Sequence, residues 1–231
     1  MIRDPRWLAH DAYFSPGAVA EQHLRGLAIL GVDPDVIVDA GSGAGAYLQR
    51  AAIVWPRALR VAVEIREEEA EHLRRWAHVV VVDSFDGART AEALGKLKRR
   101  RQLVVGNFPF SLAVPMIRWG RARGGVVSTL LPAGFGDHES AEEVLCDDPP
   151  THALRPTGGR IGFLGDGKDF QHHEALTWLA GPARPWGGWR TLPLPPLPAH
   201  LRRWTVRPGT ERTFAPLPPA FYPQFGEASH A

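Results

Sequence analysis

Cysteine is almost missing from this sequence, in which Cys146 is the only one among 231 residues. A single cysteine cannot form a disulfide within the chain, and this usage is typical of a reducing compartment, so we expect a cytoplasmic protein. No apolar run reaches the roughly 18 residues needed to cross a bilayer. Residues 1–6 (MIRDPR) lead into no apolar signal segment, and we expect no membrane partner.

The sequence also has little excess of one charge. Its 27 lysines and arginines stand against 25 aspartates and glutamates, a formal net charge of +2 that does not by itself indicate a nucleic-acid partner. Basic side chains do cluster in residues 96–101, and acidic side chains cluster in residues 67–71. A basic run of this kind is usually a solvated helix end, with phosphate contact as the alternative.

Short valine-rich runs alternate with longer helical stretches over the first two thirds of the chain. The runs expected to be buried strands are 36–39, 60–64, 79–83, 103–107 and 126–131. The stretches expected to be helices are 44–54, 67–77, 90–99, 112–121 and 139–146. This alternation predicts a doubly wound α/β fold, with a mostly parallel, seven-stranded, Rossmann-like sheet that includes an antiparallel late strand.

The last third of the sequence changes character. Residues 160–164 and 174–179 are expected to be two further strands joined by a turn at 165–168. From residue 181 onward proline, glycine and tryptophan dominate and no regular period survives. We therefore expect a catalytic domain over residues 1–180 and an irregular extension over 181–231, either packed on the domain or partly disordered.

A glycine-rich loop follows the first predicted strand and opens a predicted helix. It contains Gly41, Gly43 and Gly45, which allow a sharp turn and the close approach of a ligand. The following helix offers free N–H groups to that ligand. The loop also satisfies the dinucleotide pattern G-x-G-x-x-A, so NAD stays an alternative to S-adenosylmethionine. Asp39, directly before the loop, favours the sulfonium cofactor because a carboxylate can hold its ammonium group but would repel a pyrophosphate.

Acidic side chains end three consecutive predicted strands. They are Asp39, Glu64 and Asp83. Glu64 is placed to accept hydrogen bonds from both ribose hydroxyls of a nucleoside cofactor. Asp83 is expected to accept from the adenine amino group, with Ser84 beside the ring. One such acid could be an ordinary turn residue, whereas three at successive strand ends indicate a ligand site.

The tetrapeptide Asn107-Phe108-Pro109-Phe110 closes the fourth predicted strand. An aromatic amino group is a poor nucleophile because its lone pair is delocalised. A side-chain carbonyl from Asn107 and a backbone carbonyl near Phe108 can accept its two protons and expose that lone pair to a sulfonium methyl group. Pro109 rigidifies the turn, and Phe110 offers a face for stacking a base that has left its helix.

With both elements present, the chain resembles the class I S-adenosylmethionine-dependent amino-methyltransferases of DNA and RNA, whose hallmark is [D/N/S]-P-P-[Y/F]. Phe108 replaces the first proline of that hallmark, a form shared with ribosomal-RNA adenine dimethyltransferases. The N-terminal segment at residues 11–17 resembles the D-x-Y-x-T-P element of small phage-type N6-adenine DNA methyltransferases. By that resemblance Phe14, Ser15 and Pro16 lie over the methionine end of the cofactor. As an alternative, Ser15 could simply cap a helix that has proline at its first position.

The resemblance implies S-adenosylmethionine as cofactor and transfer of its methyl group to N6 of adenine, with DNA preferred over RNA as partner. RNA methylation, protein glutamine methylation and an inactive binding module stay open as alternatives. His172 and His173 invite a metal-site reading, but no second pair of ligands stands at suitable spacing, and we expect no metal.

Overall fold

A computed structural model describes residues 14–137, 139–156, 172–182 and 188–194. Its strands form one sheet in the order β3-β2-β1-β4-β5-β7-β6-β8. The strands are β1 (Val36–Ala40), β2 (Leu59–Glu64), β3 (Val79–Val82), β4 (Gln102–Gly106), β5 (Val126–Pro132), β6 (His152–Pro156), β7 (His173–Trp178) and β8 (Arg190–Leu194).

The strand directions confirm the predicted fold class. Strands β3, β2, β1, β4 and β5 are mutually parallel, and β7 lies antiparallel to β5 and to β6. The described residues form eight strands where seven were expected. Two of the eight, β6 and β8, were not predicted, and β8 lies in the segment predicted to be irregular. β8 contains Pro193 and lies at the end of the sheet, where a strand tolerates proline. The strand expected at 160–164 lies outside the described residues.

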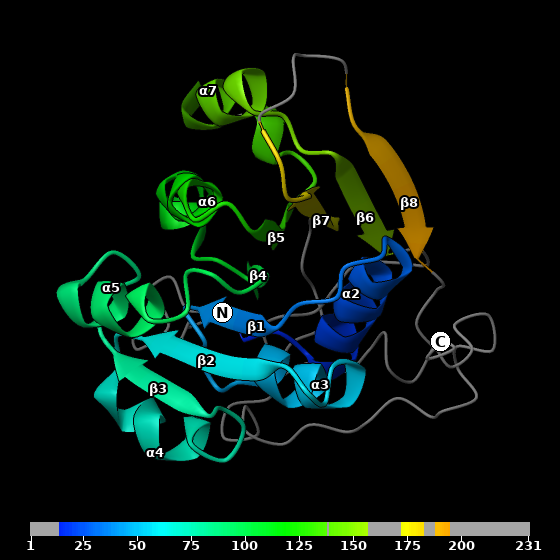
Figure 1. Ribbon diagram of the computed structural model, residues 1–231. Helices are drawn as coiled ribbons and strands as arrows, with labels where there is room; N and C mark the ends of the chain where they lie inside the picture. Colours follow the sequence, from blue (N-terminus) through cyan, green and yellow to red (C-terminus); the bar gives the residue numbers. More distant parts are fainter. Residues whose placement is uncertain (1–13, 138, 157–171, 183–187, 195–231) are drawn as a thin grey trace, which may run out of the picture.

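Helices cover both faces of the sheet (Figure 1). They are α2 (Gly17–Ile29), α3 (Ala46–Val54), α4 (Ala70–Leu73), α5 (Ala88–Gly95), α6 (Ala113–Ala122) and α7 (Glu139–Asp147), with the short 3-10 helices η1 (Glu67–Glu69), η2 (Phe110–Leu112) and η3 (Phe135–Asp137). Helices α2 and α3 pack on one face, while α6 and α7 pack on the other. No helix in these described segments is long and apolar enough to span a bilayer.

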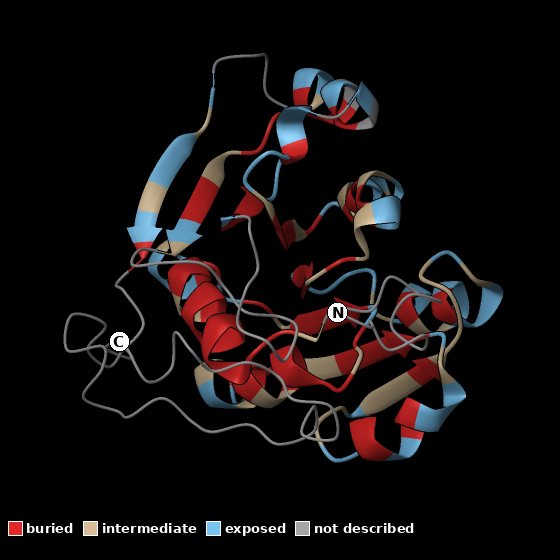
Figure 2. Cartoon of the chain, turned by 180° about the vertical axis from the view of Figure 1, so that it is seen from behind, coloured by how far each residue is buried: buried red, intermediate tan, exposed pale blue. Residues whose placement is uncertain are grey.

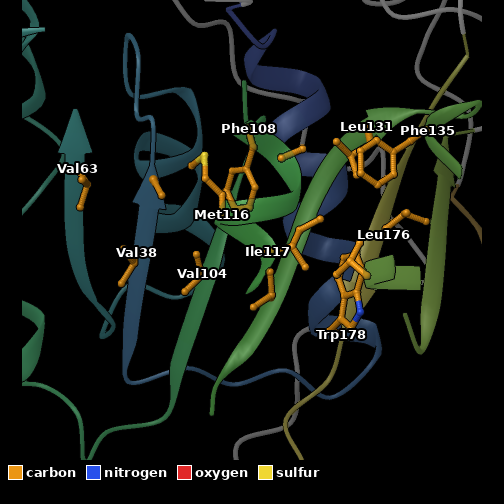
Figure 3. Packing of buried hydrophobic residues seen from close by; sticks show 14 of the residues in the cluster. Val38, Val63, Val104, Phe108, Met116, Ile117, Leu131, Phe135, Leu176 and Trp178 are labelled. Carbon is orange, nitrogen blue, oxygen red and sulfur yellow. The ribbon is translucent and has the colours of Figure 1, made fainter. Parts of the chain in front are cut away.

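The central strands are buried on both faces, as their continuous apolar runs predict. Every residue of β1 and β4 is buried (Figure 2). On the face covered by α6, Val38 and Val104 pack in the same cluster as Ile117, and the cluster continues across β7 through Trp178 (Figure 3). Burial of this kind contributes roughly 1.5–3 kcal/mol for each large apolar side chain and fixes the strand register.

Parallel strands bring their carboxyl ends to one edge of the sheet. We call this the carboxyl edge; Ala40, Glu64, Val82, Gly106 and Pro132 end β1 to β5 there. The opposite side, where these strands begin, is the amino edge. Open α/β sheets bind ligands outside the carboxyl ends of their strands, so the fold directs the search for a site to the carboxyl edge.

A buried polar chain joins helices α2 and α3 to the sheet. One ring nitrogen of His23, Nδ1, lies 2.9 Å from the Tyr47 hydroxyl, and the other, Nε2, lies 2.7 Å from Ser128 Oγ. Ser128 Oγ in turn lies 2.7 Å from Thr177 Oγ1. All four residues are buried. Because both nitrogens of His23 are used in hydrogen bonds, the side chain fixes α2 and α3 against β5 and β7.

We expect His23 to make the protein less stable in mild acid. Burial lowers the pKa of His23 from 6.5 to about 3. Between these values the unfolded chain binds a proton that the folded chain does not, so the free energy of unfolding falls as the pH decreases. The limiting slope is about 1.4 kcal/mol per pH unit. Urea titrations at several pH values should show this slope in the wild type and a shallower one in His23→Gln.

The exposed His172 supplies the matched control. The His172→Gln variant should keep the wild-type pH slope. If His23→Gln and the wild type lose stability equally as the pH falls, His23 does not titrate as its burial requires.

Candidate active site

The glycine loop between β1 and α3 adopts the backbone that its sequence predicts. Gly41, Gly43 and Gly45 have φ angles of 74°, 53° and 82°, all in the left-handed region that favours glycine. Gly45 is the N-cap of α3, and no side chain caps that helix end. The loop therefore presents bare backbone at the carboxyl edge, as a close-fitting ligand requires.

Asp39 lies in β1 just before the glycine loop, and only 1% of its surface is exposed. Its Oδ2 atom is buried and has no hydrogen-bond partner among the described residues. Burial, and secondly the nearby Glu64 carboxylate, raise the pKa of Asp39 well above its usual value. A buried carboxylate is costly unless a cation or donor satisfies it, so Asp39 is poised to receive a positively charged group.

Glu64 ends β2, and its carboxylate is already held from several sides. The Gly43 N–H donates to Oε2 at 2.7 Å. Arg66 donates to Oε1 from its backbone N–H at 3.1 Å and from Nε at 2.9 Å, and to Oε2 from Nη2 at 3.3 Å. Four hydrogen bonds match the capacity of an ionised carboxylate. Glu64 thus fixes the glycine loop through Gly43, and Arg66 takes up the rest of its hydrogen-bonding capacity.

The predicted N-terminal element lies beside the same loop. The Phe14 ring is 5.3 Å from the Arg66 guanidinium carbon, and a Cβ placed on Gly43 would lie 3.4 Å from that ring. Ser15 is buried, and its Oγ has no hydrogen-bond partner among the described residues. Pro16, rather than Ser15, is the N-cap of α2, and its carbonyl accepts from the first turn. The simple capping interpretation of Ser15 is therefore wrong.

Asp83, at the end of β3, caps a helix. Its Oδ1 accepts from the Ser84 N–H at 2.9 Å, and its Oδ2 accepts from the Arg89 N–H at 2.9 Å and more weakly from that of Thr90 at 3.4 Å. Partial burial opposes ionisation, but these backbone donors outweigh it and lower the pKa of Asp83. Ser84 Oγ donates to Asp86. The structure thus gives Asp83 a structural role at the start of α5 that its sequence position did not reveal.

The Asn107 to Phe110 turn leaves β4 directly beside the glycine loop. Strand β4 pairs with β1 in a register that sets Val105 opposite Asp39. A Cβ on Gly41 would lie 3.5 Å from Pro109 Cδ, and one on Gly106 would lie 3.0 Å from Asp39 Oδ1. The two sequence elements expected to form one site therefore lie in contact distance at the carboxyl edge.

Within this turn the side chains divide between core and site. Phe108 is 1% exposed and packs in the core, while its N–H donates to Thr129 Oγ1 at 3.3 Å. Its side chain therefore belongs to the core. Asn107 is half-buried, and its Oδ1 is shielded from solvent. Phe110 is half-buried and begins η2. The turn thus brings a half-buried amide and a half-buried aromatic ring to the end of β4.

The structure adds residues that the sequence did not single out for this site. The ring of His173, at the start of β7, stacks with Phe110 at a centroid distance of 6.1 Å and an angle of 30°. Ile65, directly after Glu64, leaves 58% of its surface exposed. The sequence signal that could have found His173 is the expected late antiparallel strand. In the structure this strand, β7, pairs His173 with Pro132 at the carboxyl edge. Across the residues that can be placed, no cluster suited to a metal ion occurs.

A comparison with protein-family models finds no match, and none is found among curated proteins. Solved structures do match. A predicted O-methyltransferase from Agrobacterium tumefaciens shares 22% identity, with a TM-score of 0.51 over 78% of this chain and 87% of its own. A candidate RNA methyltransferase from Pyrococcus horikoshii shares 17%, with a TM-score of 0.53 over 77% of this chain and 91% of its own.

The M protein of the type I restriction enzyme EcoKI is similar as well, with 14% identity and a TM-score of 0.52. The match covers 74% of this chain and 44% of that one. At these identities the likeness concerns the fold. The chain has the Rossmann-like α/β fold seen in these methyltransferases.

Proposed function

We propose that this protein is an S-adenosylmethionine-dependent methyltransferase that modifies the exocyclic N6 amino group of adenine in DNA. The observation that carries the proposal is the close approach of the glycine loop to the Asn107 turn, where a Cβ on Gly41 would lie 3.5 Å from Pro109 Cδ. Methyl transfer requires donor and acceptor to meet, and this proximity supports a site shared by the two elements.

The residues around the glycine loop suit the parts of the cofactor. Asp39 offers a buried carboxylate to the ammonium group of the methionine moiety, and this cation would satisfy its Oδ2 atom. Glu64 is the candidate partner of the ribose hydroxyls. To accept from them, its carboxylate must first lose the hydrogen bonds from the Arg66 side chain. Ile65, exposed next to Glu64, offers an apolar surface to the adenine ring. NAD fits this site less well, since its pyrophosphate offers no cation to satisfy the buried Asp39 carboxyl group.

The residues of the turn suit a planar amine acceptor. Asn107 Oδ1 and the Phe108 carbonyl are the candidate acceptors for the two amine protons, and Phe110 is the candidate stacking face. When bound, S-adenosylmethionine supplies an electrophilic methyl group, so that an N–C bond forms as the S–C bond breaks, a neutral thioether leaves and one amine proton passes to water. The protein contributes orientation and hydrogen-bond acceptors, and in this proposal no residue is alkylated.

DNA is favoured as the acceptor by the N-terminal element. Phe14 lies beside Gly43 of the glycine loop, which supports the resemblance of this segment to N6-adenine DNA methyltransferases. The similarity in fold to the M protein of a restriction enzyme is in keeping with this choice. RNA is the second candidate because of the Phe108 form of the hallmark and the similarity to a candidate RNA methyltransferase.

Removing the charge of Glu64 should weaken cofactor binding. Hydrogen bonds to a charged group contribute about 1.5–3 kcal/mol each, so we expect Glu64→Gln to raise the dissociation constant for S-adenosylmethionine by about tenfold or more in calorimetry. Asp83→Asn supplies the comparison at the neighbouring strand end. Because Asp83 caps α5, this variant should lower the melting temperature while affinity stays within about threefold. Equal losses of affinity in both variants would assign Asp83 to the cofactor.

Asn107→Ala should abolish methyl transfer and leave cofactor affinity within a few-fold, because Asn107 is expected to touch the acceptor rather than the cofactor. The assay supplies labelled S-adenosylmethionine with duplex DNA, single-stranded DNA, RNA or protein and identifies the product by nucleoside mass spectrometry. N6-methyladenine in DNA is the expected product. Methyladenine in RNA alone would refute the choice of DNA, and loss of cofactor binding in Asn107→Ala would show that the residue is misplaced.

A further inference from the structure

The amino edge of the sheet carries a cluster of exposed basic residues that the proposed reaction does not use. We call it the basic ridge; it consists of Arg57, Lys98, Arg99, Arg100 and Arg101, all exposed. Arg57 lies just before β2, and the others lie just before β4. Further exposed arginines, Arg74 and Arg75, lie in the turn that leads into β3.

Backbone hydrogen bonds show that these segments lie together. The Leu59 N–H donates to the Asp35 carbonyl, and the Asp35 N–H donates to the Arg101 carbonyl, both at 2.9 Å. The starts of β2, β1 and β4 therefore meet around Asp35. Neighbouring strands are about 4.8 Å apart, and in the described sheet β1 is the only strand between β2 and β4. The ridge residues before β2 and before β4 therefore belong to strands about 10 Å apart.

Acidic residues neutralise only one end of the basic ridge. Arg101 pairs with Asp33 at 3.1 Å and with Asp35 at 2.9 Å. The hydrogen bonds from Arg101 lower the pKa of Asp35 to about 2, so this acid is ionised at neutral pH. Within the part of the chain that the structure describes, Arg57, Lys98, Arg99 and Arg100 form no ion pair. Their mutual repulsion would be relieved by an anionic partner.

Exposed acidic side chains lie at the carboxyl edge. Glu67 and Glu68 follow β2, and Asp86 follows β3, and all three are exposed. A strand of five residues separates the two edges by about 17 Å. The basic ridge therefore lies on the side of the sheet away from the Asn107 turn and cannot contact the phosphates next to a base bound there.

We propose that the basic ridge is a second nucleic-acid contact, which binds the phosphate backbone of DNA apart from the active site. The choice of DNA as partner rests on the proposed function. Arginine predominates in the ridge, and its planar guanidinium matches phosphate oxygens with two parallel hydrogen bonds. Contacts of this kind carry no sequence information but raise affinity at low salt. The ridge would hold DNA near the protein while the carboxyl edge engages a base.

The test compares two double variants of the full chain. Arg99→Gln/Arg100→Gln removes two ridge charges, and Arg118→Gln/Arg190→Gln removes two exposed arginines on α6 and at the start of β8. Fluorescence anisotropy follows binding of a labelled duplex of about 20 base pairs between about 50 and 200 mM KCl. Loss of two phosphate contacts should reduce the slope of log K against log salt by about 1.8 and weaken binding about 60-fold at 0.1 M salt. The control should keep the parental slope.

The outcomes separate this inference from the proposed function. If the ridge variant and the parent show the same slope of log K against log salt, the basic ridge is not a DNA contact. A protein or membrane partner would then account for the exposed basic residues. Methyl transfer by the ridge variant at saturating DNA should keep the parental rate, and a lower rate would place the ridge within the active site. If the parent transfers no methyl group yet binds DNA through the ridge, the proposed function fails while the ridge contact stands.

Discussion

The parallel pairing of β1 with β4 is the constraint on which the site depends. Both strands are buried along their whole length, and their register sets Asp39 opposite Val105. Because they run in the same direction, the loops that follow them must leave from the same edge. The glycine loop and the Asn107 turn are separated in the sequence by the segment from α3 to β4, and they lie close together because β1 and β4 are parallel neighbours.

Most of this arrangement could be predicted from the sequence, because each signal was local and strong. Continuous valine-rich runs indicated buried parallel strands, and Gly41, Gly43 and Gly45 form the sharp turn expected of them, with left-handed backbone angles. The edge strand β8 escaped prediction since proline interrupts it. The capping role of Asp83 was equally hidden, because it depends on the turn of chain that brings the N–H groups of Arg89 and Thr90 back to β3.

What the sequence could not reveal are the contacts between distant segments. Arg66 and Gly43 fill the hydrogen-bonding capacity of Glu64, and Arg66 lies over Phe14, so Glu64, Phe14 and the glycine loop are one connected unit. His173 reaches Phe110 only through the antiparallel return of β7. The sequence left the basic run open between a solvated helix end and a phosphate contact, and the structure shows it on the amino edge, opposite the exposed Glu67 and Glu68. Such charge separation follows from strand direction and not from composition.

The central claim is that cofactor and acceptor are held where β1 and β4 end. A crystal structure with bound S-adenosylhomocysteine tests it most directly, since that product reports the place of the donor. We expect its ammonium group within hydrogen-bond distance of Asp39 and its sulfur directed toward the Asn107 turn. A ligand bound elsewhere, or a sulfur pointing away from Asn107, would contradict the account.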